Sequence, residues 1–526
     1  MEKPGAAVYL KEKFGVEGIL RREEKWDAQK VQIPASRLSQ SVLTEFHQIL
    51  GQEHVSTQQE DRVFHAAGRS YKDLVRLRSL KLDQAPDVVL FPSQENEIVR
   101  IIEVCRKNRI ALIPFGGGSN VVGSLEPQTG GHSAVAILNM MRFNRVIAID
   151  ELSTVATVEA GIYGPDLEKQ LTEKGWTLGH FPQSFEFSTL GGWIAMRSSG
   201  QNSILYGGVE RWVVSLRIVT PAGVIETLEI PREAAGPDLK QVLIGSEGIF
   251  GVIVSAKIRV TPQPKKQDYR MYAFPSFEEA MRATRALARS RVSVAMIRVS
   301  DGTETEAFFK LGAHPGLKST LTNVFLKFRG LKVGQFSAVI VGAEGTDSLC
   351  TWVHSQVEGI FSQFAVTSLG AGPGRRWLKD RFFLPYLRDE FMDNGVLIET
   401  FETAAVWSKA LPLHTGVRKK VQEVSAKQGA PAQIFAHLSH FYPEGVSIYF
   451  TVIAKQKKGQ EIQQWDEIKK AVNDEIRAQG GAASHHHGIG TEHRGYCWST
   501  ELEKQLLSGM KQKLDSDQIF NPGKLL

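Results

Sequence analysis

The stretch PFGGGSNVVG, Pro114–Gly123, follows the apolar run IALIP and contains three consecutive glycines. Glycines let the backbone approach a ligand closely, and successive N–H groups of such a loop form a nest for an anion such as a pyrophosphate. A tight surface turn is the alternative for a glycine triplet taken alone. Ser124-Leu125 replaces the Lys-Ser/Thr pair of a Walker loop, and Val121 takes the last glycine position of G-x-G-x-x-G, so neither familiar nucleotide motif is present.

The residues around this loop alternate between strand-like and helix-like patterns. DVVLF and IALIP are short apolar runs, and NEIVRIIEVCRKN between them places its apolar residues on one helical face. Further strand-like runs follow, up to a boundary at Pro262 and Pro264: AVAILNM, RVIAID, TVATVEAG, WVVSLRIVT, GVIETLEI and GVIVSAKIRVT. We therefore predict a nucleotide-binding domain over residues 81–264.

The rest of the chain divides into three predicted segments. Residues 1–80 form a helical N-terminal extension, in which SRLSQSVLTEFHQIL has helical apolar spacing. Residues 265–455 alternate helices and strands, starting with SFEEAMRATRALARS and SVAMIRVS, which predicts an α+β domain. Residues 456–526 form a C-terminal helical segment, in which QEIQQWDEIKKAVNDEIRAQGG ends at a Gly-Gly C-cap and a last helix begins at Thr500 with Glu503 in capping-box spacing.

Composition excludes several classes of protein. With 526 residues, 42% of them hydrophobic and 23% charged, the chain has the make-up of a globular protein with two or three domains. We find no bilayer-spanning apolar stretch, no secretory h-region in MEKPGAAVYLKEKFG and no peroxisomal S-K-L-type signal at Lys524-Leu525-Leu526. Because the three cysteines are widely separated and the basic residues behind the net charge of +6 are scattered, we expect a cytoplasmic protein without a nucleic-acid partner.

The segment ASHHHGIGTEH, 483–493, holds four of the chain's 14 histidines. An expression-tag remnant, a zinc site and a polar loop are the alternatives, and the place of the segment inside the chain argues against a tag. A closed structural zinc site usually recruits spaced Cys and His pairs, but Cys105, Cys350 and Cys497 form no C-x-x-C. We therefore predict no metal site.

Three further small-residue stretches lie in the same predicted domain as the glycine loop: EAGIYGPDLE (159–168), PQSFEFSTLGGWIAMRSSG (182–200) and GSEGIFGVI (245–253). The four stretches, in this order and linked by predicted strands, resemble the PCMH-type FAD-binding domain of the vanillyl-alcohol oxidase superfamily. The resemblance implies an α+β fold, with a two-subdomain FAD-binding domain, an α+β cap domain for substrate, the helical N-terminal extension and a C-terminal segment that completes the active site. It also implies FAD, bound non-covalently, since Phe115 and Asn120 occupy a loop in which covalent members carry a histidine.

In that superfamily the first loop holds the pyrophosphate, the Ser/Thr-rich stretch contacts the flavin and ribityl region, and the last stretch contacts the adenine side. The cofactor-binding residues so implied are Pro114, Phe115, Gly116, Gly117, Gly118, Ser119, Asn120, Gln183, Ser184, Phe185, Glu186, Phe187, Ser188, Thr189, Met196, Arg197, Ser198, Ser199, Glu247, Gly248, Ile249, Phe250, Gly251, Val252 and Ile253.

Longer segments, from about residue 61 to residue 526, resemble the alkyldihydroxyacetonephosphate synthase family: DRVFHAAGRS, PDVVLFP, GHFPQSFEFSTLGGW, VTPAGVIET, GSEGIFGVI, FETAAVW, SIYF and GGAASHHHGIG. The resemblance implies exchange of the acyl chain of acyl-dihydroxyacetone phosphate for a fatty alcohol. In this reaction of ether lipid synthesis an adduct forms at flavin N5 and there is no net redox change. The resemblance further implies a homodimer, and such a lipid substrate implies peripheral contact with membranes.

The resemblance and its departures mark the candidate site residues. Those implied to be catalytic are Tyr449, His485, His486, His487, Arg298 and His180, and those implied to bind substrate are Arg388, His437 and His440. Imidazoles near neutrality bind phosphate or shuttle protons, and a guanidinium grips two phosphate oxygens. A phenol has an ordinary pKa near ~10, so neighbouring cations must lower the pKa of Tyr449 before it acts as a base.

The chain departs from the family's pattern at several positions. Gln183 stands where the family has an acidic residue three positions after the equivalent of His180, so one carboxylate role has no occupant. His437 stands where an arginine is expected, His440 adds an imidazole, and TEHRGYC replaces a more basic segment after the histidines. These departures leave the substrate open.

Two alternative functions are consistent with parts of the sequence. An FAD-linked 2-hydroxyacid dehydrogenase or oxidase, of the D-lactate or glycolate type, shares the H-G-I-G segment at His487-Gly488-Ile489-Gly490. Such enzymes commonly carry H-G-D-G-N-x-H as a metal and substrate site, and that segment is missing. The other alternative is a flavin-binding scaffold without chemistry, against which the retention of Tyr449, Arg388 and the histidines argues.

Overall fold

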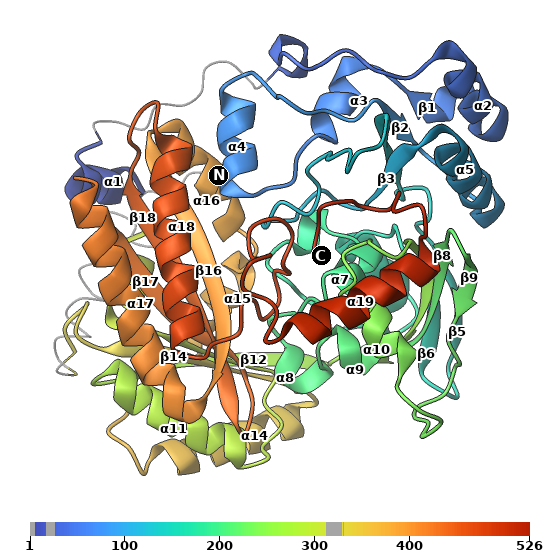
Figure 1. Ribbon diagram of the computed structural model, residues 1–526. Helices are drawn as coiled ribbons and strands as arrows, with labels where there is room; N and C mark the ends of the chain where they lie inside the picture. Colours follow the sequence, from blue (N-terminus) through green and yellow to red (C-terminus); the bar gives the residue numbers. More distant parts are fainter. Residues whose placement is uncertain (1–5, 17–26, 312–328, 330) are drawn as a thin grey trace. The chain divides into compact units, whose positions relative to one another are not determined.

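The computed structural model describes residues 6–16, 27–311, 329 and 331–526, and the chain divides into two compact units (Figure 1). Unit 1 consists of Met1–Glu23, Gln201–Leu205 and Pro264–His485, and unit 2 of Glu24–Gly200, Tyr206–Gln263 and His486–Leu526. Residues 1–80, predicted as one extension, are distributed over both units, and the chain passes from unit 1 to unit 2 inside the triple histidine. Among the described residues, no helix is both long and apolar enough to cross a membrane.

Unit 2 contains a four-stranded sheet in the order β1-β2-β4-β3. Its strands are β1 (Val55–Ser56), β2 (Val88–Leu90), β3 (Ile110–Phe115) and β4 (Ala134–Asn139). Strands β2, β4 and β3 are parallel, and the predicted helix α5 (Glu95–Asn108) connects β2 to β3. All of β4, and all of β3 except Pro114, is buried, which explains their continuous apolar sequences because both faces of a parallel sheet are covered. The glycine loop leaves the carboxyl end of β3.

The second sheet of unit 2 is antiparallel, in the order β5-β6-β10-β8-β9. Its strands are β5 (Val146–Asp150), β6 (Val155–Glu159), β8 (Val213–Thr220), β9 (Gly223–Glu226) and β10 (Val252–Arg259), and β7 (Trp176–Thr177) pairs separately with β11 (Thr261–Pro262). Strand β9 is shorter than the predicted run GVIETLEI because its pairing with β8 ends at Glu226. Two separate sheets in one unit match the predicted two-subdomain arrangement.

Side-chain caps set the ends of two helices of unit 2. Thr500 and Glu503 form the predicted capping box of α19, and the helix expected from residue 36 begins at Gln40 because Ser39 caps it. The helices of this unit are α2 (Gln40–Leu50), α3 (Gln59–Phe64), α4 (Tyr71–Arg78), α5, α6 (Gly164–Thr172), α7 (Leu190–Ala195), α9 (Val209–Trp212), α10 (Leu239–Leu243) and α19 (Glu501–Leu514), while α8 (Ser203–Tyr206) lies at the unit boundary.

The residues after α19 return to the edge of β3. Leu112 of β3 donates its N–H to the carbonyl of Ile519 at 2.8 Å and forms a β-bridge with Phe520. Two buried charges hold this turn: Asp515 accepts from the amides of Ile519 and Phe520 at 3.1 and 2.8 Å, while Lys511 pairs with Asp515 and donates to the Phe520 carbonyl at 2.8 Å. The strand that precedes the glycine loop is thereby fixed from the C-terminal side of the chain.

Unit 1 is built on a seven-stranded sheet in the order β15-β12-β14-β13-β17-β18-β16, in which all neighbours are antiparallel. Its strands are β12 (Lys266–Phe274), β13 (Met296–Ser300), β14 (Ser337–Gly345), β15 (Thr367–Gly370), β16 (Val396–Val406), β17 (Gln433–Phe441) and β18 (Gly445–Lys455). Strands β17 and β18 form a hairpin whose register places His437 opposite Tyr449, and the next pair places Glu402 of β16 opposite Tyr449.

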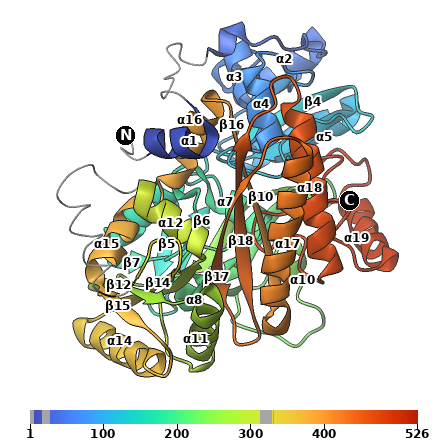
Figure 2. The same cartoon turned by 90° about the vertical axis from the view of Figure 1, so that its left-hand side faces the viewer.

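The two faces of this sheet differ because side chains alternate along each strand. One face is apolar and is covered by α11 (Phe277–Arg289), α14 (Asp347–Phe361), α17 (Trp407–Lys427) and α18 (Glu461–Ala478), as Figure 2 shows. The other face carries apolar clusters under α1 (Ala6–Phe14), α12 (Gly302–Leu311), α15 (Ala371–Asp380) and α16 (Leu384–Asp393). On that second face Arg298, His437, Tyr449 and Glu402 share one side of four neighbouring strands.

The Lys511–Asp515 pair predicts a large loss of stability on substitution. Lys511→Met leaves the carboxylate of Asp515 buried without its cation, so we expect the free energy of unfolding to fall by about 3–5 kcal/mol. Lys513→Met, on an exposed position of the same helix, is the control and changes it by less than about 0.5 kcal/mol. Urea denaturation followed by circular dichroism measures both, and equal stabilities of the two variants contradict the prediction.

Candidate functional site

The glycine loop after β3 lies against the Ser/Thr-rich stretch of unit 2. A Cβ atom on Gly116 would lie 2.2 Å from Oγ1 of Thr189, and one on Gly117 would lie 2.0 Å from the carbonyl oxygen of Phe187. Gly118 has φ +69°, a left-handed conformation that favours glycine. Close approach of two chain segments therefore requires these glycines, and it brings the first and the third predicted cofactor stretches together.

The same stretch continues around the loop through α7. Thr189 caps α7 by accepting from the Gly192 amide at 3.3 Å, and Asn120 of the loop donates to Sδ of Met196 at 3.6 Å. The guanidinium of Arg197 instead donates to the carbonyl of Gln241 at 3.1 Å. The backbone around residues 196–199 is thus fixed beside the glycine loop. The Arg197 side chain instead contacts α10, just before the fourth stretch.

Glu247 connects three of these segments. Its carboxylate accepts from the amides of Ile489 and Gly490 at 2.6 and 2.8 Å and from the hydroxyl of Ser124 at 2.8 Å. Burial raises the pKa of this carboxyl group, against the three hydrogen bonds that favour its charged form. The side chain therefore holds the H-G-I-G segment to the end of the glycine loop, a role that the sequence did not indicate.

His180 lies in the core of unit 2. Its ring packs against Trp193 and Trp212, with centroids at 4.8 and 5.2 Å, and Nε2 lies 2.9 Å from the hydroxyl of Ser198. Burial lowers the pKa of His180 to about 3, so the imidazole is neutral at physiological pH. His486 and His487 belong to the same unit, are half-buried and have ring centroids 4.6 Å apart.

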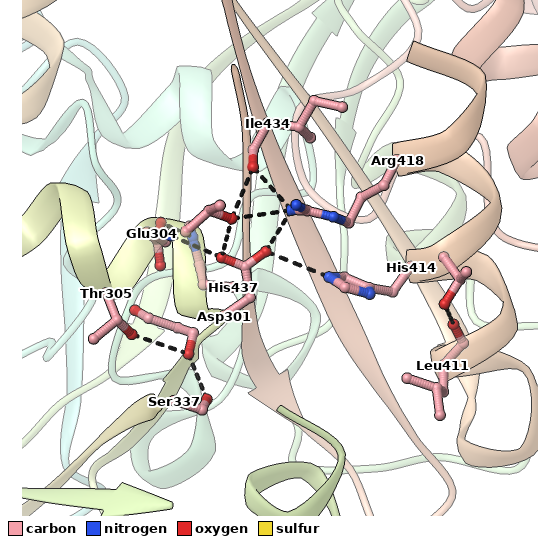
Figure 3. A network of polar contacts seen from close by, with 12 residues as sticks. Asp301, Glu304, Thr305, Ser337, Leu411, His414, Arg418, Ile434 and His437 are labelled. Atoms are coloured by element: carbon pink, nitrogen blue, oxygen red, sulfur yellow. Dashed lines mark hydrogen bonds and ion pairs between the residues drawn. The ribbon is translucent and has the colours of Figure 1, made fainter. Parts of the chain in front are cut away.

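In unit 1 the predicted residues form a polar row across four strands, from Arg298 through His437 and Tyr449 to Glu402. The ring of His437 stacks on Tyr449 with centroids 4.9 Å apart. Glu304 of α12 joins the row, because its Oε1 lies 2.8 Å from Nδ1 of His437 (Figure 3). The same oxygen lies 3.0 Å from Nη2 of Arg298. The antiparallel register thus gathers residues that are far apart in the sequence.

The environment of Tyr449 favours the protonated phenol. Burial raises its pKa to about 12, although a hydrogen bond with Thr400 and the charge of Arg388 act in the opposite direction. The nearby carboxylates of Glu402 and Glu399 raise the pKa further. The sequence argument required neighbouring cations to lower this pKa, but burial dominates, so the phenol keeps its proton at neutral pH.

His440 and His485 form a second cluster in unit 1. Their rings stack with centroids 4.8 Å apart, Nδ1 of His440 lies 2.8 Å from the hydroxyl of Ser203, and Nε2 of His485 lies 2.7 Å from the phenol oxygen of Tyr442. Glu402 positions the backbone beside them, since it accepts from the amide of His485 at 2.6 Å and from the Ser484 hydroxyl. The polar row and the imidazole pair therefore share Glu402.

Two protein families match successive parts of the chain. Residues 86–229 match the FAD binding domain family, and residues 263–525 match the C-terminal domain of FAD linked oxidases. An alkyldihydroxyacetonephosphate synthase from Dictyostelium discoideum is 36% identical over 474 residues, which cover 88% of this chain and 77% of that protein. The chain belongs to the alkyldihydroxyacetonephosphate synthase family.

Solved structures confirm the predicted fold. A structure of an alkyldihydroxyacetonephosphate synthase superposes with a TM-score of 0.86 at 31% identity, covering 99% of this chain and 92% of that one. p-Cresol methylhydroxylase superposes with a TM-score of 0.72 at 15% identity, over 93% of this chain and 98% of that one, and so shares the fold. The α+β, PCMH-type architecture expected from the small-residue stretches is therefore correct.

FAD is the cofactor of this synthase-family chain. The loops of unit 2 fit it, because the half-buried residues 116–120 follow a strand end, where main-chain amides can hold a pyrophosphate. The hydroxyl of Ser246 and Nδ1 of His180 are buried polar atoms with no hydrogen-bond partner within the described part of the chain, as expected beside a polar ligand. We propose the glycine loop, residues 183–189 and the backbone of residues 196–199 as its binding segments.

Sequence reasoning missed several carboxylate and hydroxyl groups that contact the candidate site residues of this synthase-family chain. Glu304, Ser203 and Tyr442 contact the candidate histidines, and no family motif named them. Glu402 lay inside the quoted segment FETAAVW. Strand alternation places it on the same face as Thr400, but its position opposite Tyr449 depends on the β16–β18 register, which the sequence does not show.

The buried neutral His180 predicts a pH-dependent stability. The unfolded chain protonates this histidine near pH 6.5 and the folded chain only near pH 3, so folding is weakened as the pH falls through this window. His180→Gln keeps a donor for Ser198 but has no such titration. We expect the stability difference between the natural chain and this variant to shrink by about 2 kcal/mol between pH 7.5 and pH 5.0. Urea unfolding at both values measures it, and a constant difference contradicts the assignment.

The contacts of Glu247 predict a local loosening on substitution. Glu247→Gln replaces one acceptor oxygen by an NH2 group that faces a donor, so we expect the amides of Ile489 and Gly490 to lose about 1–3 kcal/mol of protection. Hydrogen–deuterium exchange with mass spectrometry reads this from peptides that cover residues 486–493. Glu229→Gln, at an exposed position of the same unit, is the control. Identical exchange in both variants would show that the contacts of Glu247 do not stabilise this segment.

Proposed function

We propose that this chain is an FAD-dependent alkyl transferase that exchanges the acyl chain of acyl-dihydroxyacetone phosphate for a fatty alcohol. The observation that carries the proposal is the polar row of unit 1, which combines a phenol donor, an imidazole and an arginine in a chain of the synthase family. Such a set suits a phosphate ester whose reaction needs proton transfers. Small-molecule lipid substrates are the class supported by this membership.

The residues of unit 1 take different parts in the proposed reaction. Arg388 lies near Tyr449 and supplies positive charge for the phosphate, whereas the charge of Arg298 is balanced by Glu304. Tyr449, protonated at neutral pH, donates a hydrogen bond to an oxygen of the substrate. His485 is oriented by Tyr442 and by the contact of its backbone amide with Glu402. FAD, when bound, supplies an electron-accepting ring that can take up and release the substrate carbon without net redox change.

Further parts of the proposal rest on the family resemblance and on composition. We propose non-covalent FAD, a homodimer and peripheral contact with membranes, in keeping with a lipid substrate. A cytoplasmic location is in keeping with three free cysteines, at positions 105, 350 and 497. The runner-up function, FAD-linked oxidation of a 2-hydroxyacid, has the H-G-I-G segment in its favour and lacks the H-G-D-G-N-x-H segment.

An anaerobic absorbance titration tests the function. We expect palmitoyl-dihydroxyacetone phosphate to bleach the flavin of the holoprotein and hexadecanol to restore it without an electron acceptor. Tyr449→Phe should slow the bleaching about 100-fold or more, because the positioned proton donor is lost. Tyr386→Phe, at an exposed position of α16, serves as the control with an unchanged rate. Bleaching only by D-2-hydroxyacids, with recovery that needs oxygen or a quinone, would establish the oxidation instead.

A further inference from the structure

We propose that Glu304 fixes His437 as the proton acceptor of the polar row, so that the two residues form a carboxylate–histidine pair that deprotonates the substrate. The choice of substrate rests on the function proposed above, and the pairing itself rests on geometry. No family motif names Glu304, and His437 occupies a position where the family pattern has an arginine.

Three atoms form a tight triangle at the centre of this pair. Oε1 of Glu304 lies 2.8 Å from Nδ1 of His437 and 3.0 Å from Nη2 of Arg298, and these two nitrogens are 3.0 Å apart. A guanidinium nitrogen has no lone pair to offer, and a carboxylate oxygen has no proton. The short contact between Oε1 and Nδ1 is attractive when Nδ1 carries the proton, and the proposal assigns this tautomer over the one in which Nδ1 accepts a hydrogen bond from Arg298. In the neutral ring, the lone pair then belongs to Nε2.

Glu304 is held in place by its own helix and by a second buried carboxylate. The amide of Glu304 donates to Oδ1 of Asp301 at 2.7 Å, in the first turn of α12. Asp301 in turn accepts from Arg418 at 2.7 Å and lies 3.4 Å from Nε2 of His414, both on α17 (Figure 3). The carboxylate that contacts His437 is therefore fixed by a network that reaches the opposite face of the sheet.

The surrounding charges support a neutral histidine beside an ionised carboxylate. Burial is the largest single influence on the pKa of Glu304 and raises it, but Arg298, His437 and a hydrogen bond with Ser300 together hold this pKa well below its ordinary value. Burial and Arg298 lower the pKa of His437, while Glu304 and Asp301 raise it, with a net lowering. Tyr449 faces His437 from β18 as a protonated phenol. A neutral imidazole at pH 7 is ready to accept a proton.

The proposed step moves one proton. A C–H bond breaks at the substrate carbon between the ketone and the acyl oxygen, and an N–H bond forms at Nε2 of His437. The electron pair of the broken bond stays on the substrate and is shared with the ketone oxygen. The new imidazolium is stabilised by Glu304, as a carboxylate stabilises a catalytic histidine elsewhere. Donor and acceptor are thus separate residues, with Tyr449 as donor and His437 as acceptor.

Two substitutions test the pair in the holoprotein. His437→Asn retains an N–H donor toward Glu304 but has no basic nitrogen. We therefore expect the flavin bleaching by palmitoyl-dihydroxyacetone phosphate to slow at least about 100-fold, while the half-saturating substrate concentration changes less than about threefold.

Glu304→Gln removes the charge that raises the pKa of His437. The acidic limb of the pH–rate profile should therefore move to lower pH, and the maximal rate should fall about tenfold or more. Glu306→Gln, on the same helix, is the matched control with neither effect.

A readout independent of activity keeps the test decisive. In nitrogen-15 NMR spectra of histidine-labelled holoprotein, the His437 signals, assigned by their loss in His437→Asn, should show a protonated Nδ1 and an unprotonated Nε2. A protonated Nε2, or a His437→Asn rate within threefold of the natural chain, overturns the proposal. If the tautomer is as expected but the acyl ketone phosphate does not bleach the natural holoprotein, the pair stands and the proposed substrate is overturned.

Discussion

A buried carboxylate costs several kcal/mol of stability unless donors surround it, and three glutamates of this chain meet that requirement by arranging the segments around them. Glu304 gathers Arg298 and His437, Glu402 gathers Ser484 and the amide of His485, and Glu247 gathers Ser124 with the residues after the histidines. In each case at least one of these donors comes from a distant part of the sequence. The need to pair these buried charges with donors thus determines where the functional groups lie, and the apolar clusters exclude water around them.

Strand register turns this requirement into a site. Because side chains alternate along a strand, the pairing of β17, β18 and β16 decides that His437, Tyr449 and Glu402 share a face. A shift of one residue in either pair would send one of them into the apolar layer under α17 and α18. The eleven paired positions of β16 and β18, from Val396↔Lys455 to Val406↔Gly445, make such a shift unfavourable. Long, regular pairing and a polar face are therefore two aspects of one arrangement.

Local features of the sequence were sufficient for individual elements, since glycine chemistry, apolar periodicity and caps act between near neighbours, whereas the PCMH-type fold was inferred from a family resemblance. The glycine loop, α5, α19 and the buried strands were predicted for that reason. The site required contacts across long separations, such as the 133 residues between Glu304 and His437, which no local pattern encodes. The protonation of Tyr449 was missed for the same cause, because burial is a property of the assembled sheet and outweighs the charge of Arg388.

The bridge between Leu112 and Phe520 has a consequence for the order of events during synthesis. The residues that complete the edge of strand β3 follow it about 400 residues later, which at typical translation rates takes roughly 20–80 s. Until then the strand that leads into the glycine loop lacks one edge partner. Unit 2 therefore reaches its final form only after the residues around Phe520 have been made, and loading of its cofactor belongs to the time after that.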